Sequence, residues 1–202
     1  PGPALRLGRD RHRAAGAVGL NTPAHMALGL AVLGREARRG EWIAILAGAM
    51  LPDLAYFLGW AVAGRPEALR LMADLFNSLP LWLVALGACL LLRQRTAALL
   101  CGGALLHILT DLPLHATDAH AHFWPLTDWR WQSPVSFWDA DYHGRIAGVL
   151  EGVLFAACLA AIWSRLEGQG QKALTLVFAL VYAIAFVHFV GHAFAGQHWA
   201  IW

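Results

Sequence analysis

Charged residues are scarce in this chain. Asp, Glu, Lys and Arg together make up 14% of its 202 residues, whereas soluble domains usually contain about a quarter. Hydrophobic residues make up 58%, and the mean hydropathy is +0.52. The chain also contains ten tryptophans, whose indole rings favour the membrane–water interface. This composition predicts an integral membrane protein whose main partner is the lipid bilayer.

The chain also lacks a strong excess of either charge, and it has few cysteines. Its formal net charge of +2 excludes the strongly basic surface that binds nucleic acid. The three cysteines, Cys89, Cys101 and Cys158, are isolated within apolar runs. Their odd number and the absence of CxxC spacing predict neither a disulfide framework nor a thiolate metal site. We expect them to be small core residues.

Long apolar runs recur along the chain and set its expected fold class. A helix needs about 20 apolar residues to cross the hydrocarbon, and fewer where neighbouring helices help. Five runs qualify and a sixth, 23–34, is short; the five are 42–63, 79–92, 96–112, 146–163 and 173–194. We therefore expect an all-α, polytopic transmembrane bundle of five to six helices. A basic N-terminal tail, residues 1–20, without a convincing signal-peptide cleavage site, precedes a single helical domain over 21–202.

The positions of the basic residues predict the orientation of this bundle. Arginines and a lysine follow the runs 23–34, 79–92 and 146–163, and in a six-helix count these loops share one side. The positive-inside rule makes that side cytoplasmic, so the long loop 113–145, rich in His and Asp, is periplasmic. The basic tail instead favours five helices, with 23–34 not crossing the membrane. Both counts remain open.

Ionisable side chains inside the apolar runs are the main candidates for function, because each costs roughly 2.5–3.5 kcal/mol to insert. Asp53 follows Pro52, which cannot donate a backbone hydrogen bond and loosens the helix there. Its alternatives are a ligand or catalytic group and a plain ion pair with an arginine. Glu151 is flanked by small residues; it is either a general acid or base, or the partner of a histidine.

His107 and Asp111 are four residues apart, so a helix places both side chains on one face. An imidazole nitrogen with a carboxylate oxygen suits zinc or another divalent first-row metal. The same pair can equally be a simple hydrogen bond that satisfies a buried imidazole. Asp53, together with His25 at the start of the run 23–34, would complete a metal site.

Further histidines lie in the loop that follows this pair. His115, His120 and His122, with Asp118, come after the helix-breaking Pro113. They are candidates for metal ligands or for proton-transfer groups at the mouth of a site, with Asp118 a candidate catalytic base. For each histidine taken singly, the composition of the loop favours a solvated side chain.

His188 and His192 form a second pair four residues apart, in the last apolar run. Histidines in an apolar helix can bind a haem or a chlorophyll-type macrocycle through a ring nitrogen. Hydrogen bonding between helices is the commoner explanation for such a pair. A coloured purified protein would distinguish the two.

Several short motifs follow one another in an order that carries a family resemblance. They are NTPAHMALG, AGAMLPDLAYF, LFNSLPLWL, the H-x3-D pair at 107–111 and FWPLT. In this order the chain resembles the metal-dependent hydrolases of the bacterial inner membrane, a family also described as LexA-binding and inner-membrane-associated. It is most similar to a subgroup with NTPAH starts and AHFWPLTDW segments, often labelled cobalamin biosynthesis proteins. The resemblance covers about residues 21–151.

The resemblance implies metal ligands at His25, Asp53, His107 and Asp111, and a multi-pass location in the bacterial inner membrane. Where many members of the family have His-Ser, this chain has Asn77-Ser78. Asparagine is a poorer zinc ligand than imidazole and cannot act as a base.

Two functions from different classes follow. The first is a metal-dependent hydrolase with zinc as the expected metal. It acts on a lipid-like or amphiphilic substrate, with Asp118, Glu151 or a loop histidine as proton acceptor or donor. The second is a non-catalytic transmembrane subunit or assembly factor of a larger membrane complex. In that case the polar residues would be hydrogen-bond contacts between helices, and small residues would pack against partner helices. A macrocycle-binding protein that uses His188 or His192 is a third hypothesis.

Overall fold

A computed structural model describes residues 22–58, 66–137 and 140–195, and the basic tail 1–20 lies outside these ranges. The described residues contain helices, short 3-10 turns and loops but no strand, which confirms the all-α prediction. The helices are α1 (Thr22–Leu33), α2 (Trp42–Met50), α3 (Leu54–Leu58), α4 (Pro66–Phe76), α5 (Leu79–Leu91), α6 (Arg95–Asp111), α7 (Gly144–Trp163) and α8 (Gln169–Ala195).

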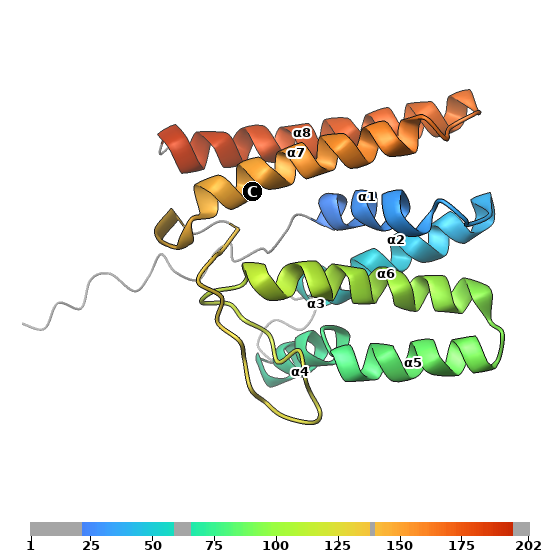
Figure 1. Cartoon of the computed structure of the whole chain (residues 1–202). Coiled ribbons are helices and arrows are strands. Elements are labelled where there is room, and N and C mark those ends of the chain that lie inside the picture. The colour runs from blue at the N-terminus through green and yellow to red at the C-terminus, as the bar shows by residue number, and fades with distance from the viewer. Residues whose placement is uncertain (1–21, 59–65, 138–139, 196–202) are drawn as a thin grey trace, which may run out of the picture.

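Helix α6 lies at the centre of the bundle (Figure 1). It packs against α2, α5 and α1, and α1 in turn packs against α2 and α7. Helices α7 and α8 form a long hairpin on the outer side of α1 (Figure 1). The beginning of α1 and the ends of α2 and α6 consequently lie at the same end of the bundle, so residues far apart in sequence meet there.

Within the described part of the chain, three helices are long and apolar enough to cross a membrane, namely Arg95–Leu114, Gly144–Trp163 and Gln169–Ala195. Helices α4 and α5 add a fourth span if the pair, bent by 47°, crosses as one unit. Helix α1 and the segment Trp42–Asp53 are apolar but shorter. These lengths fit a membrane protein. By length and composition the described helices supply three or four spans, fewer than the five to six expected from the sequence.

The apolar run 42–63 does not form one helix. Helix α2 ends at Met50, and a 3-10 turn over Leu51–Asp53 leads into α3; residues 59–65 lie outside the described ranges. Pro52 provides the physical reason, since its ring and missing N–H disrupt a helix. Its carbonyl oxygen accepts a hydrogen bond of 3.0 Å from Nδ2 of the buried Asn77. This turn carries Asp53 to the end of the bundle.

Two glycines let α2 and α6 approach until their backbones touch. A Cβ added to Gly48 would lie 2.0 Å from the carbonyl oxygen of Leu100, and one added to Gly103 would lie 2.6 Å from that of Ile45. No other residue type fits at these two positions without separating the helices. The close approach brings the end of α2 directly against the last two turns of α6.

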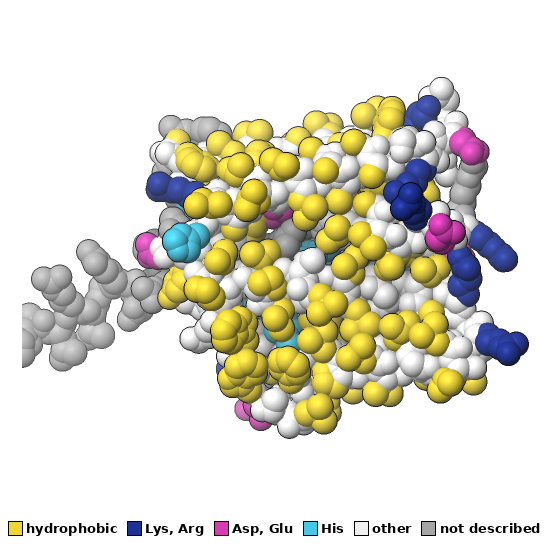
Figure 2. Space-filling model, in the orientation of Figure 1, with side chains coloured by type: hydrophobic (Ala, Val, Ile, Leu, Met, Phe, Trp, Pro, Cys, Tyr) yellow, Lys and Arg dark blue, Asp and Glu magenta, His cyan; other side chains and the backbone are white. Residues whose placement is uncertain are grey.

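The surface is apolar over most of the helices and basic at one end. Yellow hydrophobic side chains cover much of the face in Figure 2, and most of the lysines and arginines coloured there lie at the end where α6 begins. Ion pairs and hydrogen bonds connect the loops there: Arg95 pairs with Glu41 at 3.2 Å, and Arg165 donates to Ala31 O at 3.1 Å. The basic loops therefore share one end, as the orientation analysis predicts.

The loop 115–137 folds back over the opposite end. Its backbone is fixed by hydrogen bonds from Leu79 N to His122 O (2.8 Å) and from Ser133 N to His115 O (2.8 Å). Arg130 Nη2 holds both carboxylate oxygens of Asp74, on α4, at 2.8 and 2.7 Å. The outer surface of the loop carries exposed tryptophans, which suit a membrane–water interface.

Candidate metal centre

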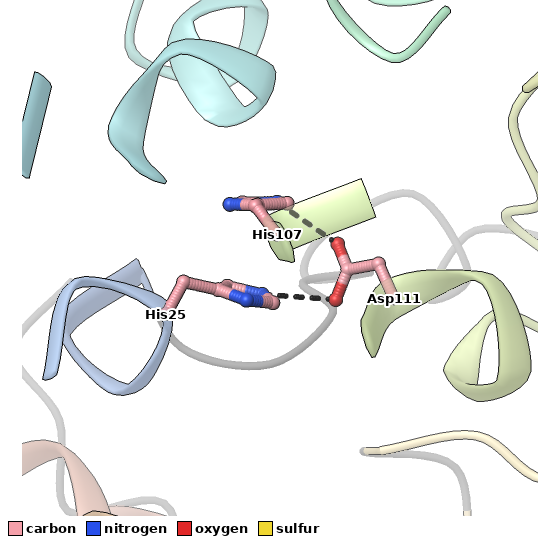
Figure 3. A group of neighbouring side chains, drawn as sticks. All are labelled: His25, His107 and Asp111. Carbon is pink, nitrogen blue, oxygen red and sulfur yellow. Dashed lines mark hydrogen bonds and ion pairs between the residues drawn. The ribbon is translucent and has the colours of Figure 1, made fainter. Parts of the chain in front are cut away.

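Three of the predicted ligands meet in the interior, at the end of the bundle covered by the loop. His25 comes from the first turn of α1, and His107 and Asp111 come from the last turns of α6 (Figure 3). Their exposures are 2%, 1% and 2%. His25 Nε2 lies 2.9 Å from Asp111 Oδ1, and His107 Nε2 lies 3.1 Å from Asp111 Oδ2. One ligand atom from each residue lies within 4.8 Å of the others, so the group could hold a metal ion.

The fourth predicted ligand, Asp53, lies beside this group. Its Oδ1 is 3.6 Å from His107 Nε2. Its other oxygen accepts a hydrogen bond from the hydroxyl of Thr22, in the first turn of α1. The side chain is buried, and the 3-10 turn after α2 aims it at the imidazole of His107. A cation between Asp53 and Asp111 would therefore contact carboxylates from two different segments.

The hydrogen bonding of His107 fixes which ring nitrogen carries its proton. Nδ1 lies 2.6 Å from the carbonyl oxygen of Ala49, which can only accept, so Nδ1 is the donor. In the neutral ring Nε2 then presents a lone pair, and it faces the carboxylates of Asp111 and Asp53. This is how metal-binding histidines are usually held, with the far nitrogen bonded to a carbonyl or carboxylate.

His25 is held in the same way. Its Nδ1 lies 3.2 Å from the hydroxyl of Thr110, and that hydroxyl donates to the carbonyls of Leu106 and His107 at 2.9 and 2.8 Å. Because the two carbonyls share the single hydroxyl hydrogen, the hydroxyl oxygen is available to accept from His25 Nδ1. His25 Nε2 and Asp111 Oδ1 are buried and have no hydrogen bond among the described residues, although they lie 2.9 Å apart.

Two imidazole lone pairs thus face one carboxylate, and this arrangement requires a cation. The ion pairs of Asp53 and Asp111 in the described ranges are all with histidines, and no lysine or arginine reaches them. A buried carboxylate without a compensating charge costs several kcal/mol. Either protons on the Nε2 atoms or a metal ion must supply that charge. The rings of His25 and His107 are also stacked, with centroids 3.6 Å apart, and two adjacent imidazolium rings repel each other. This repulsion disfavours a proton on both rings, so the charge beside Asp111 must come from a metal ion or from His115, whose Nε2 lies 3.1 Å from Asp111 Oδ2.

The loop histidines are not solvated, contrary to the expectation for each taken singly. His115, His120 and His122 are 1%, 7% and 2% exposed. Contacts between segments that are distant in sequence bury them, because the folded-back loop covers the end of α6. His115 Nδ1 donates to Asp118 Oδ2 at 2.8 Å, and His115 Nε2 lies 3.1 Å from Asp111 Oδ2. The loop therefore adjoins the His25–His107–Asp111 group.

The two carboxylates that flank His115 set its charge. Burial alone would lower its pKa, but its contacts with Asp111 and Asp118 raise the pKa to about 10. Burial would raise the pKa of Asp118, and its hydrogen bond to His115 lowers it below its ordinary value instead. For His120, burial and the neighbouring His115 and His122 lower the pKa to about 3. A carboxylate that is bonded and has a low pKa is a weak proton acceptor, so this geometry favours Asp118 as a positioning residue for His115.

Asn77 helps to orient the loop histidines, a role that was not predicted from the sequence. Asn77 Nδ2 donates to the carbonyls of Pro52 and Ala73, both at 3.0 Å, and the Asn77 carbonyl lies 3.2 Å from His122 Nδ1. Both hydrogens of the Asn77 amide group are donated to carbonyls. A histidine at this position could not make both contacts through one ring nitrogen. The polar pair Asn77-Ser78 at the start of an apolar run was the sequence signal for this role. We interpreted Asn77 only as the replacement of a histidine ligand.

The remaining predicted residues lie on the outer hairpin and are not part of the His25–His107–Asp111 group. Glu151 is buried on α7 and accepts a hydrogen bond of 2.9 Å from the hydroxyl of Tyr182 on α8. His188 is half-buried and His192 is exposed, both on α8. Catalysis by Glu151 and macrocycle binding by the two histidines stay predictions.

In comparisons with known proteins, no family model, curated protein or solved structure matches the chain. The function must therefore be argued from the site itself.

Proposed function

We propose that this protein is a metal-dependent hydrolase of the bacterial inner membrane, with one zinc ion held by His25, His107, Asp111 and Asp53. One observation carries the proposal: two buried histidines, each bonded through Nδ1 to an oxygen acceptor, aim Nε2 at the same carboxylate. Two imidazole nitrogens with one or two carboxylate oxygens form a donor set that zinc prefers in catalytic sites, where a further position stays open.

The chain's own residues would hold the ion rigidly. Ala49 and Thr110 fix the two imidazole rings, and Thr22 fixes the carboxylate of Asp53. Zinc bound there supplies Lewis-acid polarisation of a phosphoryl or acyl oxygen and lowers the pKa of water toward neutrality. The low exposure of all the ligands excludes bulk water, which strengthens each electrostatic contact.

The location of the site supports an amphiphilic substrate. The group lies at the end of α6, a helix long and apolar enough to cross the membrane, and tryptophans on the loop suit the interface. The basic loops lie at the other end (Figure 2), which favours a periplasmic position for the site. A substrate with an apolar tail in the bilayer would present its head group at this depth.

The test is hydrolysis of phospholipids and acyl esters in mixed micelles by zinc-loaded, detergent-purified protein. We expect turnover that a chelator abolishes, that His107→Ala reduces at least 100-fold, and that the matched control His188→Ala leaves unchanged. Chelator-insensitive turnover, or equal turnover by His107→Ala, would overturn the proposal. A protein that binds no zinc and turns over no ester would instead support the non-catalytic subunit.

A further inference from the structure

Four histidines around the end of α6 share one arrangement of hydrogen bonds. In each, Nδ1 lies within hydrogen-bond distance of an oxygen that accepts its proton, so that the neutral ring presents a bare Nε2. The four contacts are His25 to Thr110 Oγ1 (3.2 Å), His107 to Ala49 O (2.6 Å), His115 to Asp118 Oδ2 (2.8 Å) and His122 to Asn77 O (3.2 Å). The proposed zinc centre uses only the first two of these histidines.

The other two histidines are equally buried, with exposures of 1% for His115 and 2% for His122. Within the described ranges His122 Nε2 has no hydrogen-bond partner, and His115 Nε2 faces a carboxylate oxygen, Asp111 Oδ2, at 3.1 Å. Leaving a buried polar atom unsatisfied costs about 1–3 kcal/mol. The unsatisfied Nε2 of His122, together with a His115 Nε2 that faces a carboxylate as the nitrogens of the first centre do, indicates a ligand. A cation there would replace the proton that Asp111 and Asp118 otherwise hold on His115.

His115 adjoins the first centre through Asp111. His115 Nε2 and His107 Nε2 both lie 3.1 Å from the same oxygen, Asp111 Oδ2. The ring of His120 lies between the other two loop histidines, with its centroid 5.1 Å from that of His115 and 5.8 Å from that of His122. The histidines therefore form one continuous cluster, and Asp111 sits between its two halves.

We propose that the loop forms a second divalent-metal position, with His115 and His122 as ligands and Asp111 bridging the two cations. The proposal rests on the first centre and deepens its function. The hydrogen bond from His115 to Asp118 is the carboxylate–histidine–metal arrangement found around zinc, in which the carboxylate orients the ring. Asp118 is thus a positioning residue for the second cation.

A bridged pair of cations specifies the substrate class. Two metals about 3.5–4 Å apart bind two oxygens of one phosphate group, an arrangement that recurs in phosphatases and nucleases. An acyl ester has a single carbonyl oxygen to bind and gains less from the second ion. The substrate class that fits is a phosphate ester with an apolar tail.

The test is the number of Mn²⁺ and Zn²⁺ ions bound per chain by the detergent-solubilised full chain, measured by equilibrium dialysis and mass spectrometry. We expect two ions for the wild type and the control His188→Ala, and one ion for His115→Ala and for His122→Ala. One ion in the wild type and in His115→Ala would overturn the second position and leave the first centre standing. No ion in the wild type would overturn both.

A second measurement needs no variant and so does not depend on whether the variants fold. Two Mn²⁺ ions bridged by Asp111 give an exchange-coupled electron paramagnetic resonance spectrum in the wild type. A six-line spectrum from wild-type protein that holds two ions would show that the second ion lies away from Asp111 and would overturn the proposal.

Discussion

Gly48→Ala is the substitution that tests how packing positions the site. The added Cβ would lie 2.0 Å from Leu100 O, and real Cβ contacts essentially never fall below 3.0 Å. Helices α2 and α6 must therefore separate by about 1 Å. The same separation at the next residue would lengthen the 2.6 Å contact from His107 Nδ1 to Ala49 O to about 3.6 Å, beyond hydrogen-bond distance.

The magnitude follows from three effects. Overpacking costs about 1–3 kcal/mol, and the lost hydrogen bond of a buried ring costs about 1–3 kcal/mol. The better helix propensity of alanine returns about 0.8–1.0 kcal/mol. The net destabilisation is about 1–5 kcal/mol, or roughly 2–20 °C in Tm for a chain of this size. Because His107 loses its orientation, we also expect zinc to bind at least tenfold more weakly.

The assays are thermal melting and zinc dialysis in one detergent, with Gly87→Ala as the matched control. Gly87 lies on α5, and a Cβ added there meets nothing within 4 Å. The control therefore gains helix propensity and should melt at or slightly above the wild-type temperature with unchanged zinc affinity. A Gly48→Ala protein that melts and binds zinc like the wild type would refute the packing argument.

Three further substitutions test single contacts. Asn77→Ala removes two donors to buried carbonyls and should cost about 2–4 kcal/mol in thermal melting; an unchanged Tm would contradict its bridging role. Tyr182→Phe removes the hydroxyl bonded to Glu151 and should cost about 1–3 kcal/mol, whereas no loss would show that another partner suffices. Arg130→Gln breaks the two-pronged contact with Asp74, so limited proteolysis should cut the loop faster than in the wild type; equal rates would mean that backbone contacts alone hold it.

The helices and the central pair of the site are predictable from the sequence. The spacing of His107 and Asp111 places them on one helix face wherever α6 begins, and apolar runs locate α6, α7 and α8 to within a few residues. The proximity of His25 is different, because it depends on how α1 packs against α6. The sequence offered His25 as a further ligand and the resemblance implied the same, but neither carries the packing that brings the two helices together.

The loop and the break in 42–63 are where sequence analysis failed. The burial of the loop histidines depends on contacts such as that of Arg130 with Asp74, 56 residues apart. Local composition carries no signal of such contacts. The apolar run indicated one span, but Pro52 and the donor Asn77 together stabilise a 3-10 turn there. The role of Asn77 was not predictable for the same reason, because the carbonyl of Pro52 that it bonds lies 25 residues away in sequence.

The most direct test of the account is the zinc-edge X-ray absorption spectrum of the purified, zinc-loaded protein. The account predicts nitrogen and oxygen ligands at about 2.0–2.2 Å, with the outer-shell scattering of imidazole rings, and loss of that scattering together with the zinc in His25→Ala, His107→Ala protein. Bound zinc whose spectrum shows no imidazole, or sulfur at about 2.3 Å, would contradict the assignment of the site.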